Sequence, residues 1–322
     1  MNCQRFAVLF SVFVMIASSA IPATAQPTPR TAWGDPDLGG IWDYRTITPM
    51  QRPEKYADQE FLTEEEAAAL EQGAVDREIA ASEAPAVRTE VGGSIGCCNR
   101  FWLDYGTTVV GERRTSLIVD PPNGRRPPMT PEAQEAASKR PGWGQEPPPD
   151  TYADLSSIDR CMGSTGLPII PAPYNNNVQI FQTPDHVAIL IESMHLSRII
   201  SLDGRPHANV AQYVGDSRGR WEGDTLVVET MHFDGGLQMI AGSVPDRLVE
   251  RFTRVGEDIQ YAFTVEDAKT WVAPWTAAVP LTKTDAPIFE YACHEGNYAM
   301  VNMLAGARAG ERAAAAAKQG AR

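Results

Sequence analysis

The feature that most constrains the fold of this chain is a series of short apolar runs, rich in β-branched residues, that begins at residue 177. We expect strands at 177–183, 186–192, 197–202, 225–231, 248–255, 259–265, 275–281 and 288–294. Turn formers such as Pro184-Asp185 and Gly223-Asp224 separate them. Short strands with tight turns at regular spacing are typical of up-and-down barrels and strongly bent sheets. The pattern predicts a mainly β protein with an antiparallel, barrel-like, lipocalin-like meander over residues 170–300.

The preceding residues, 26–150, are expected to form an N-terminal arm around this meander, with a hairpin and a few short helices. Proline and turn formers dominate residues 26–60, and one apolar island, Gly40-Ile41-Trp42, can add a strand. Thr63 and Glu66 form a capping-box pattern, which predicts a surface helix that runs to about residue 80. The sequence therefore indicates an arm that packs around the barrel.

Further signals divide the rest of the chain. The β-branched runs 107–110 and 115–119 predict the hairpin of the arm, and Thr130-Pro131 predicts the start of a short helix. Residues 305–322 are rich in alanine and charge, which indicates a helical tail. We expect a single β-rich domain over residues 26–304.

The first 25 residues have the composition of a secretory signal peptide. Arg5 supplies a basic start, residues 6–20 are apolar and uncharged, and Ala23-Thr24-Ala25 supplies small residues for cleavage before Gln26. The apolar run is shorter than the roughly 20 residues of a membrane-spanning helix, and no later segment is long and apolar enough to span a bilayer. We therefore expect a periplasmic or secreted protein without membrane insertion.

The charge of the chain narrows the choice of partners. The formal net charge is −13 at pH 7, and an acidic protein repels phosphate backbones and anionic lipids. Nucleic acid is therefore not an expected partner, and a small molecule is. The sequence contains no P-loop, HExxH or dinucleotide-binding motif, so we expect no organic cofactor.

Four cysteines follow the expected cleavage site: Cys97, Cys98, Cys161 and Cys293. In an oxidising compartment cysteines are more often paired than free. The four allow three pairings, and a bond between the adjacent Cys97 and Cys98 would close a strained ring. We favour a Cys161–Cys293 disulfide, which would tie the start of the β region to its last strand. A zinc site is the alternative, although the close paired-ligand spacing is missing.

The histidines suggest where chemistry could occur. All five lie after residue 185, near the ends of expected strands, and alternate strand ends of an antiparallel barrel gather at one mouth. We expect His195 or His232 to act as a general base, Arg205 to stabilise negative charge, and His294 with Glu295 to donate a proton. The alternative for each histidine is a satisfied polar residue in a loop or in the core.

The position of His232 follows from strand periodicity. Leu226 and Val228 lie on one face of the expected strand 225–231, and a period of two places Thr230 and His232 on the same face. His232 is therefore predicted at the inner rim of the barrel. A bulge at the strand end would instead turn it toward solvent.

Other side chains are candidates for substrate binding. Tyr174, Asn175 and Asn176 offer a phenol and two amides just before a strand, Trp221 offers an aromatic wall, and Asp216 lies in a run of alternating charge.

Several blocks together resemble a large family of secreted bacterial proteins of unknown function, found in soil acidobacteria and proteobacteria. The blocks are residues 114–122 (RTSLIVDPP), 174–177 (YNNN), 203–207 (DGRPH), 215–225 (GDSRGRWEGDT), 250–254 (ERFTR) and 291–298 (YACHEGNY). The resemblance covers most of residues 33–308. It implies export and a β-rich fold, and it implies no particular reaction.

Some positions depart from the pattern of that family. Met231-His232 stands where the family suggests Thr-Asn, Leu196 follows His195 in place of Asp, and Tyr105 replaces Arg. These changes make a pocket less polar, which suggests a site adapted to a specific, rather apolar substrate with Tyr105 among its contacts.

Three functions agree with these observations. The first is a secreted, cofactor-independent enzyme that cleaves a small, partly apolar compound, with aromatic compounds as the expected class, by hydrolysis or lyase-type elimination, for instance at an ether or ester bond. The second is a periplasmic small-molecule-binding protein of lipocalin-like type. The third is a metal-dependent hydrolase that uses several histidines with Asp203 or Asp216.

Overall fold

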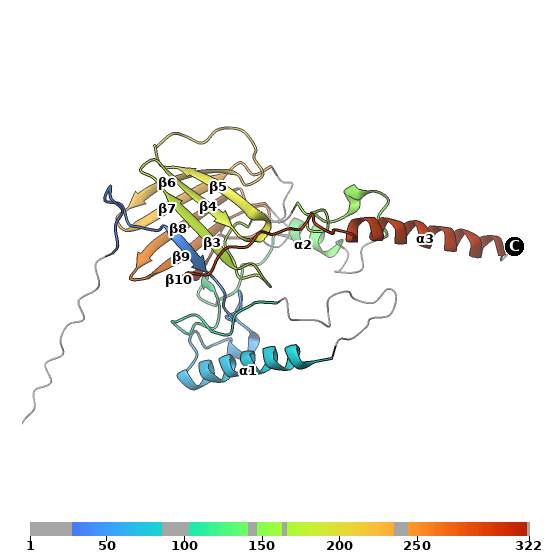
Figure 1. Ribbon diagram of the computed structural model, residues 1–322, viewed down its shortest axis with the longest axis horizontal. Helices are drawn as coiled ribbons and strands as arrows, with labels where there is room; N and C mark the ends of the chain where they lie inside the picture. The colour runs from blue at the N-terminus through green and yellow to red at the C-terminus, as the bar shows by residue number, and fades with distance from the viewer. Residues whose placement is uncertain (1–27, 86–102, 141–146, 163–165, 235–243, 321–322) are drawn as a thin grey trace, which may run out of the picture.

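The computed structural model describes residues 28–85, 103–140, 147–162, 166–234 and 244–320 (Figure 1). The expected signal peptide, Cys97 and Cys98 lie outside the described residues. The described residues form three α-helices: α1 (Glu64–Glu83), α2 (Pro131–Ser138) and α3 (Ala299–Gly320). They also form ten strands: β1 (Gly40–Asp43), β2 (Ile118–Asp120), β3 (Asn177–Gln182), β4 (His186–Ile191), β5 (Leu196–Ser201), β6 (Asp216–Glu222), β7 (Thr225–Met231), β8 (Arg247–Val255), β9 (Asp258–Glu266) and β10 (Trp275–Thr284).

Nine of these described strands close into a barrel, in the order β1-β3-β4-β5-β6-β7-β8-β9-β10 and back to β1. The arm strand β1 completes the ring, because Trp42 lies opposite Val178 of β3 on one side and Lys283 of β10 on the other. Strand β2 pairs with β10 beside this junction. The barrel is mixed, since β5 and β6 are paired in parallel at Ser201 and Arg218. The predicted barrel-like β fold is confirmed, with one parallel pair that the sequence does not predict.

Alternation along the strands fills the barrel with side chains. In β8, Leu248, Glu250 and Phe252 are fully buried, whereas Arg251 between them is exposed. Aromatic rings continue the core across neighbouring strands, with centroids 4.8 Å apart for Phe252 and Tyr261 and 5.8 Å apart for Phe263 and Trp275. The interior is a packed core, as in other small barrels.

One ion pair lies inside this core. The guanidinium of Arg198 (β5) donates two hydrogen bonds to the carboxylate of Glu250 (β8), at 2.6 and 2.8 Å, and both side chains are buried. The Tyr261 hydroxyl donates to Glu250 at 2.7 Å and accepts from the backbone N–H of Ile169 at 3.1 Å. The network ties three strands to the segment that precedes β3.

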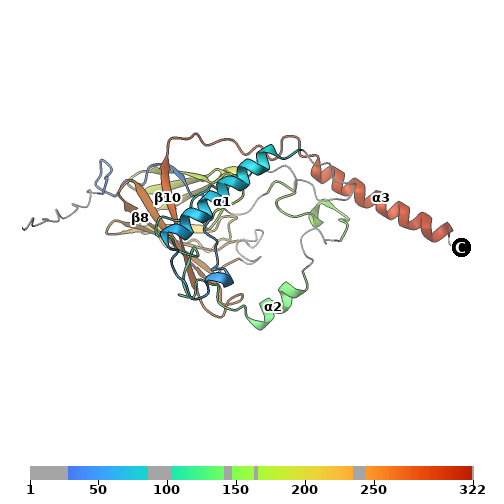
Figure 2. The ribbon, with the colours of Figure 1, turned by 90° about the horizontal axis from the view of Figure 1, so that it is seen from below.

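The helix starts follow the sequence signals. Thr63 and Glu66 make the predicted reciprocal capping box at the start of α1, and the Thr130 side chain caps α2, whose first residue is Pro131. Helix α1 lies beside the barrel with only Ala67 and Ala74 buried, and α3 projects away from it (Figures 1 and 2). No helix among the described residues is long and apolar enough to cross a membrane.

The predicted hairpin of residues 107–110 and 115–119 does not form. The Thr108 carbonyl accepts from Ile47 N–H, and Val110 N–H donates to the Thr48 hydroxyl, so the first run bonds to the arm. The second run provides β2, which pairs with β10. The sequence pattern identifies β-branched segments but not their partners.

The last predicted strand, 288–294, is also absent from the described sheet. Both sides of β10 are already occupied, by β9 on one side and by β1 and β2 on the other. The chain after β10 therefore crosses the strand ends, where Phe289 N–H donates to Glu192 and Tyr291 N–H donates to His195. The tail helix begins at Ala299, earlier than expected.

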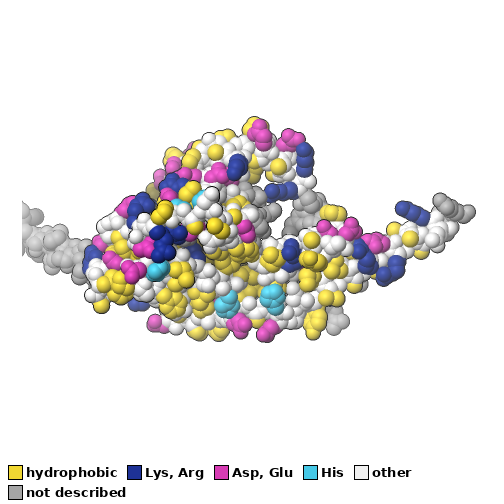
Figure 3. Space-filling view, turned by 90° about the horizontal axis from the view of Figure 1, so that it is seen from above, with side chains coloured by type: hydrophobic (Ala, Val, Ile, Leu, Met, Phe, Trp, Pro, Cys, Tyr) yellow, Lys and Arg dark blue, Asp and Glu magenta, His cyan; other side chains and the backbone are white. Residues whose placement is uncertain are grey.

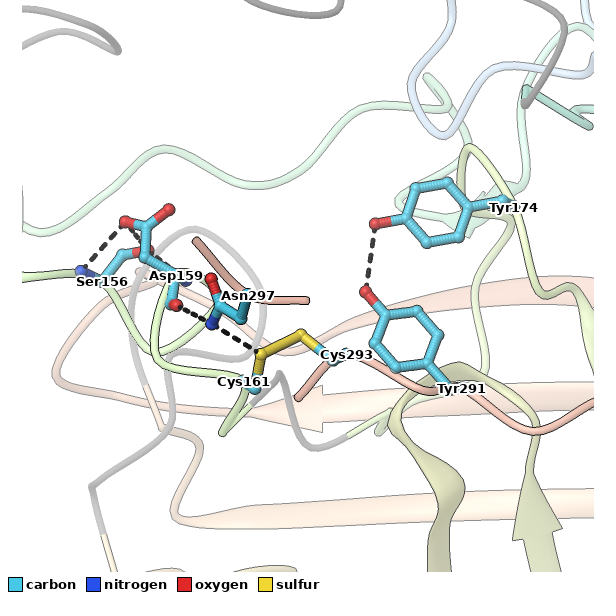
Figure 4. The surroundings of a disulfide bond; sticks show 7 residues. All are labelled: Ser156, Asp159, Cys161, Tyr174, Tyr291, Cys293 and Asn297. Carbon is cyan, nitrogen blue, oxygen red and sulfur yellow. Dashed lines mark hydrogen bonds between the residues drawn. A yellow bond between two sulfur atoms is a disulfide. The ribbon is translucent and has the colours of Figure 1, made fainter. Parts of the chain in front are cut away.

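The favoured disulfide is confirmed. Cys161 and Cys293 are bonded, with Cα atoms 5.6 Å apart (Figure 4). The Asn297 side chain donates to Cys161 Sγ and to the Asp159 carbonyl, at 3.1 and 3.0 Å. The bond holds the segment after β10, instead of a last strand, against the segment that precedes β3.

Candidate functional site

A cavity of about 600 Å³ lies at the end of the barrel where β3 begins and β4 ends. We call it the tyrosine pocket, and its wall consists of Arg45, Asp104, Tyr174, Asn175, Asn176, Asn177, Glu192, Ala286, Pro287, Phe289 and Tyr291. Three predicted substrate-binding residues, Tyr174, Asn175 and Asn176, are therefore brought together. The volume is within the range of small-molecule sites, roughly 300–1,000 Å³.

Two stacked tyrosines form one wall of the pocket. The rings of Tyr174 and Tyr291 are nearly parallel, with an interplanar angle of 8° and centroids 6.1 Å apart, and their hydroxyls lie 3.3 Å apart (Figure 4). Burial, followed by the hydrogen bond to Tyr174, raises the pKa of Tyr291 well above its ordinary value. The Tyr291 phenol therefore stays protonated at neutral pH and can donate a hydrogen bond.

A buried carboxylate forms the floor. Glu192 follows β4 directly, and its two oxygens accept from Asn177 Nδ2 at 2.8 Å and from Phe289 N–H at 3.1 Å. Both donors come from elements of the pocket wall, so Glu192 fixes the segment after β10 to the start of β3. It presents a firmly held negative charge to the cavity.

The amides beside Tyr174 are engaged with the protein itself. Asn176 is buried, and its side chain bonds to the backbone of Ala172 and to the Asp104 carbonyl. The carbonyl of Asn175, whose φ is +56°, accepts from the Tyr44 hydroxyl at 3.1 Å. These asparagines shape the loop that carries Tyr174.

His195 lies directly behind the pocket wall. It occupies the turn between β4 and β5, with φ +50°, and its Nδ1 accepts from Tyr291 N–H at 3.0 Å. A neutral ring with this bond carries its proton on Nε2. His294 and Glu295 are exposed in the turn that follows Tyr291, and neither belongs to the pocket wall.

The other predicted residues are elsewhere, so the predicted catalytic set is not assembled at one mouth. Arg205 lies beyond the opposite end of β5 from His195, is exposed, and is paired with Asp203. Trp221 points inward and packs against the core. Tyr105 lines a separate cavity of about 810 Å³ beside α1.

His232 belongs to a second cluster on the outer face of β6 and β7. The ring of His207 joins Asp216 through Nδ1 at 3.2 Å and Glu229 through Nε2 at 3.3 Å, and the His232 ring lies 6.1 Å from it. Strand β7 ends at Met231, and His232 has φ +56°. The strand period therefore stops before His232, and the prediction of the inner rim is wrong.

Asp216 is likewise held by protein groups. Arg218 lies 2.6 Å from one oxygen, and the Ala208 N–H donates to the other at 2.8 Å. Together with His207, these contacts hold the 202–215 connection against the outside of the barrel. Figure 3 shows one face of the molecule, on which acidic and basic side chains are intermingled. In the part of the chain that the structure describes, no group of three or more His, Cys, Asp or Glu residues is arranged to hold a metal ion.

The sequence reasoning did not single out Glu192, Arg45 and Phe289 as site residues. Glu192 could have been identified from the sequence, because it is the first charged residue after the alternating run of β4 and lies where the strand meets a loop. No sequence signal identifies Arg45 and Phe289, because their positions in the pocket wall depend on how the arm and the segment after β10 fold back.

No model of a known protein family matches the chain, and a comparison with curated proteins finds no match either.

The pKa of four tyrosines is raised by burial, that of Tyr213 least, and the other three are expected to ionise last in an alkaline titration. Burial is the main cause that raises the pKa of Tyr44, Tyr261 and Tyr291. In the unfolded chain each would ionise near pH 10. The burial of these neutral phenols therefore contributes fully to the stability of the folded protein below about pH 10, and this contribution is lost as the pH rises further.

Absorbance at 295 nm, recorded during a pH titration of the native protein, checks this expectation. Tyr291→Phe should remove one late-ionising group, whereas denaturant should let all tyrosines ionise together. If every phenol of the native protein ionised near pH 10, the assignment of these three would be contradicted.

Proposed function

We propose that this chain is a secreted, lipocalin-like protein that binds a small, partly apolar aromatic compound in the tyrosine pocket. The observation that carries the proposal is the Tyr174–Tyr291 pair, which offers flat aromatic surface and phenol groups in one cavity. Aromatic rings prefer to stack in offset or edge-to-face arrangements, each worth about 0.5–1.5 kcal/mol beyond area burial. A ligand with an aromatic ring and a hydrogen-bond acceptor matches both properties of the wall.

Two further observations support this proposal. The interior of the barrel is filled by its own side chains, so the external pocket is the better place for a ligand. The disulfide and the signal-like residues 1–25 agree with a periplasmic or secreted protein, because disulfides persist in oxidising compartments.

The second candidate function is cleavage of the same compound without a cofactor, by hydrolysis or lyase-type elimination at an ether or ester bond. It is favoured by His195, which contacts the backbone of Tyr291, and by the protonated Tyr291 phenol. In this scheme Tyr291 would act as the proton donor, and His195 could act as a general base only after its Nδ1, the unprotonated ring nitrogen, releases the Tyr291 N–H. Binding is the first choice, because none of the predicted catalytic residues His195, Arg205, His232, His294 and Glu295 is part of the pocket wall.

One experiment tests both candidates. The purified mature protein is incubated with a panel of small aromatic ethers, esters and phenols, the melting temperature is measured, and each compound is then analysed by chromatography. A shift in melting temperature with the compound intact supports the binding protein. A shift accompanied by product supports the enzyme.

Tyr291→Ala is expected to weaken binding at least tenfold, which corresponds to about 1.4 kcal/mol. Tyr298→Ala is the matched control, because Tyr298 lies seven residues further on, is 74% exposed, and is outside the pocket wall. Equal affinities for wild type and Tyr291→Ala would contradict the location of the site.

A further inference from the structure

A different part of the barrel contains a concentration of buried donors that lack an acceptor. Among the described residues, eight buried side-chain nitrogen atoms have no hydrogen-bond partner in the protein. Four of the eight belong to one neighbourhood: Arg52 Nε, Arg126 Nε, Trp271 Nε1 and Trp275 Nε1. Buried polar groups are normally satisfied, so such a cluster requires an explanation.

Ring contacts connect three of these side chains, and hydrogen bonds of neighbouring residues place Arg52 beside them. The Arg126 guanidinium lies 5.8 Å from the ring centre of Trp271 and 5.4 Å from that of Trp275. The backbone N–H of Arg126 donates to the Gln51 side chain at 3.1 Å, next to Arg52 in the chain. Arg126 is thus held on two aromatic rings and beside the backbone of Arg52.

Arg52 is also held in place. Its backbone N–H donates to the Gly124 carbonyl at 2.8 Å, and only 6% of the residue is exposed. Gly124 has φ +69°, and a Cβ at this position would meet Ser116 Oγ and lie 3.0 Å from Arg52 Nε. The turn can approach Arg52 this closely only because residue 124 is glycine.

Neither guanidinium has a neutralising partner. No hydrogen bond or ion pair joins the side chain of Arg52, Arg125 or Arg126 to any residue within the described ranges, although the chain has 41 acidic residues. Burial alone lowers the pKa of Arg126. In contrast, the charge of the buried Arg198 is neutralised by Glu250, which accepts from both of its terminal nitrogens. An unpaired buried cation is costly, and an anion would offset that cost.

We propose that Arg52 and Arg126 form a binding site for a small oxyanion with a carboxylate or phosphate group. Guanidinium groups bind both through parallel N–H donors. The oxyanion would accept from the terminal N–H groups of the two guanidiniums, because the Nε atoms are themselves buried, and Arg125 would add positive charge beside it. The site is separate from the tyrosine pocket and does not rest on the proposed function.

The test is a titration of the full mature chain with inorganic phosphate and, separately, with benzoate, at constant ionic strength maintained with chloride. Melting temperature and tryptophan fluorescence are the readouts, since Arg126 lies over two indoles. We expect a saturable rise in melting temperature with at least one anion. A response to phosphate alone identifies a phosphate site, and a response to benzoate alone identifies a carboxylate site.

Arg126→Gln is expected to weaken the response at least tenfold. Arg220→Gln should leave it unchanged, because Arg220 is exposed on β6 and paired with Glu222. Arg126→Lys keeps the positive charge but lacks the planar guanidinium, so it should give an intermediate affinity. It replaces Arg126→Gln in the test if that variant does not fold. The absence of a saturable response in wild type, or an unchanged affinity in the folded Arg126 variants, would overturn the proposal in favour of bound water.

Discussion

Replacing Arg198 by methionine is expected to lower the free energy of unfolding by about 3–5 kcal/mol, measured by urea denaturation followed by circular dichroism. Glu250 and its ring of contacts lie in the packed interior, where the side chain is fully buried. Removal of Arg198 leaves this carboxylate in a low-dielectric core, where among the described residues only the Tyr261 hydroxyl still donates a hydrogen bond to its oxygens. The unpaired charge of Glu250 is therefore the expected cause of the lower free energy of unfolding.

Two variants make this prediction specific. In Arg198→Met with Glu250→Leu, no charge remains, so most of the lost stability should return. Arg247→Met is the matched control, because Arg247 pairs with Glu229 and Glu266 on neighbouring strands but is 37% exposed. Surface pairs of this kind contribute about 1 kcal/mol or less. A loss in Arg198→Met no larger than that of Arg247→Met would show that water reaches the barrel interior.

Removing the disulfide, by Cys161→Ser together with Cys293→Ser, is expected to destabilise the protein by about 2–5 kcal/mol. The two cysteines are 132 residues apart in sequence, and a long loop loses much conformational entropy in the unfolded state when it is cross-linked. Because Cys293 lies two residues after Tyr291, ligand affinity in the tyrosine pocket should fall as well.

Reduction provides the control for the disulfide. Dithiothreitol should lower the melting temperature of wild type toward that of the double serine variant and leave the variant itself unchanged. Equal melting temperatures for oxidised wild type and the variant would contradict the structural role. Mass mapping of non-reduced peptides should recover Cys161 linked to Cys293.

The strands of the meander could be predicted because their signals are local. Val187, Ile189 and Ile191 alternate within one strand, and Pro184-Asp185 marks the turn before it. Closure of the barrel could not be predicted, since β1 has four residues and pairs with β10 about 240 positions later. Pairing partners across such distances depend on the whole fold.

In the candidate site, too, local features could be predicted from the sequence and long-range contacts could not. The Tyr174–Asn177 block led to the tyrosine pocket because it directly precedes β3. The histidines were grouped incorrectly because the parallel pairing of β5 with β6 sends residues 202–215 back along the outside of the barrel, where His207 meets Glu229. A left-handed residue such as His232 also leaves no signal in strand periodicity.

Closure by β1 has a consequence for the order in which the chain can fold. As residues emerge from a ribosome, β3 is available to β1 long before β10, but the ring cannot close until residue 284 is present. Until then the edge of β1 that pairs with β10 has no partner. This open edge of the sheet is prone to pairing with other chains. Contacts between such distant segments also slow folding. The barrel can therefore close only after β10 has been synthesised, and any truncation before β10 leaves β1 without one of its two partner strands.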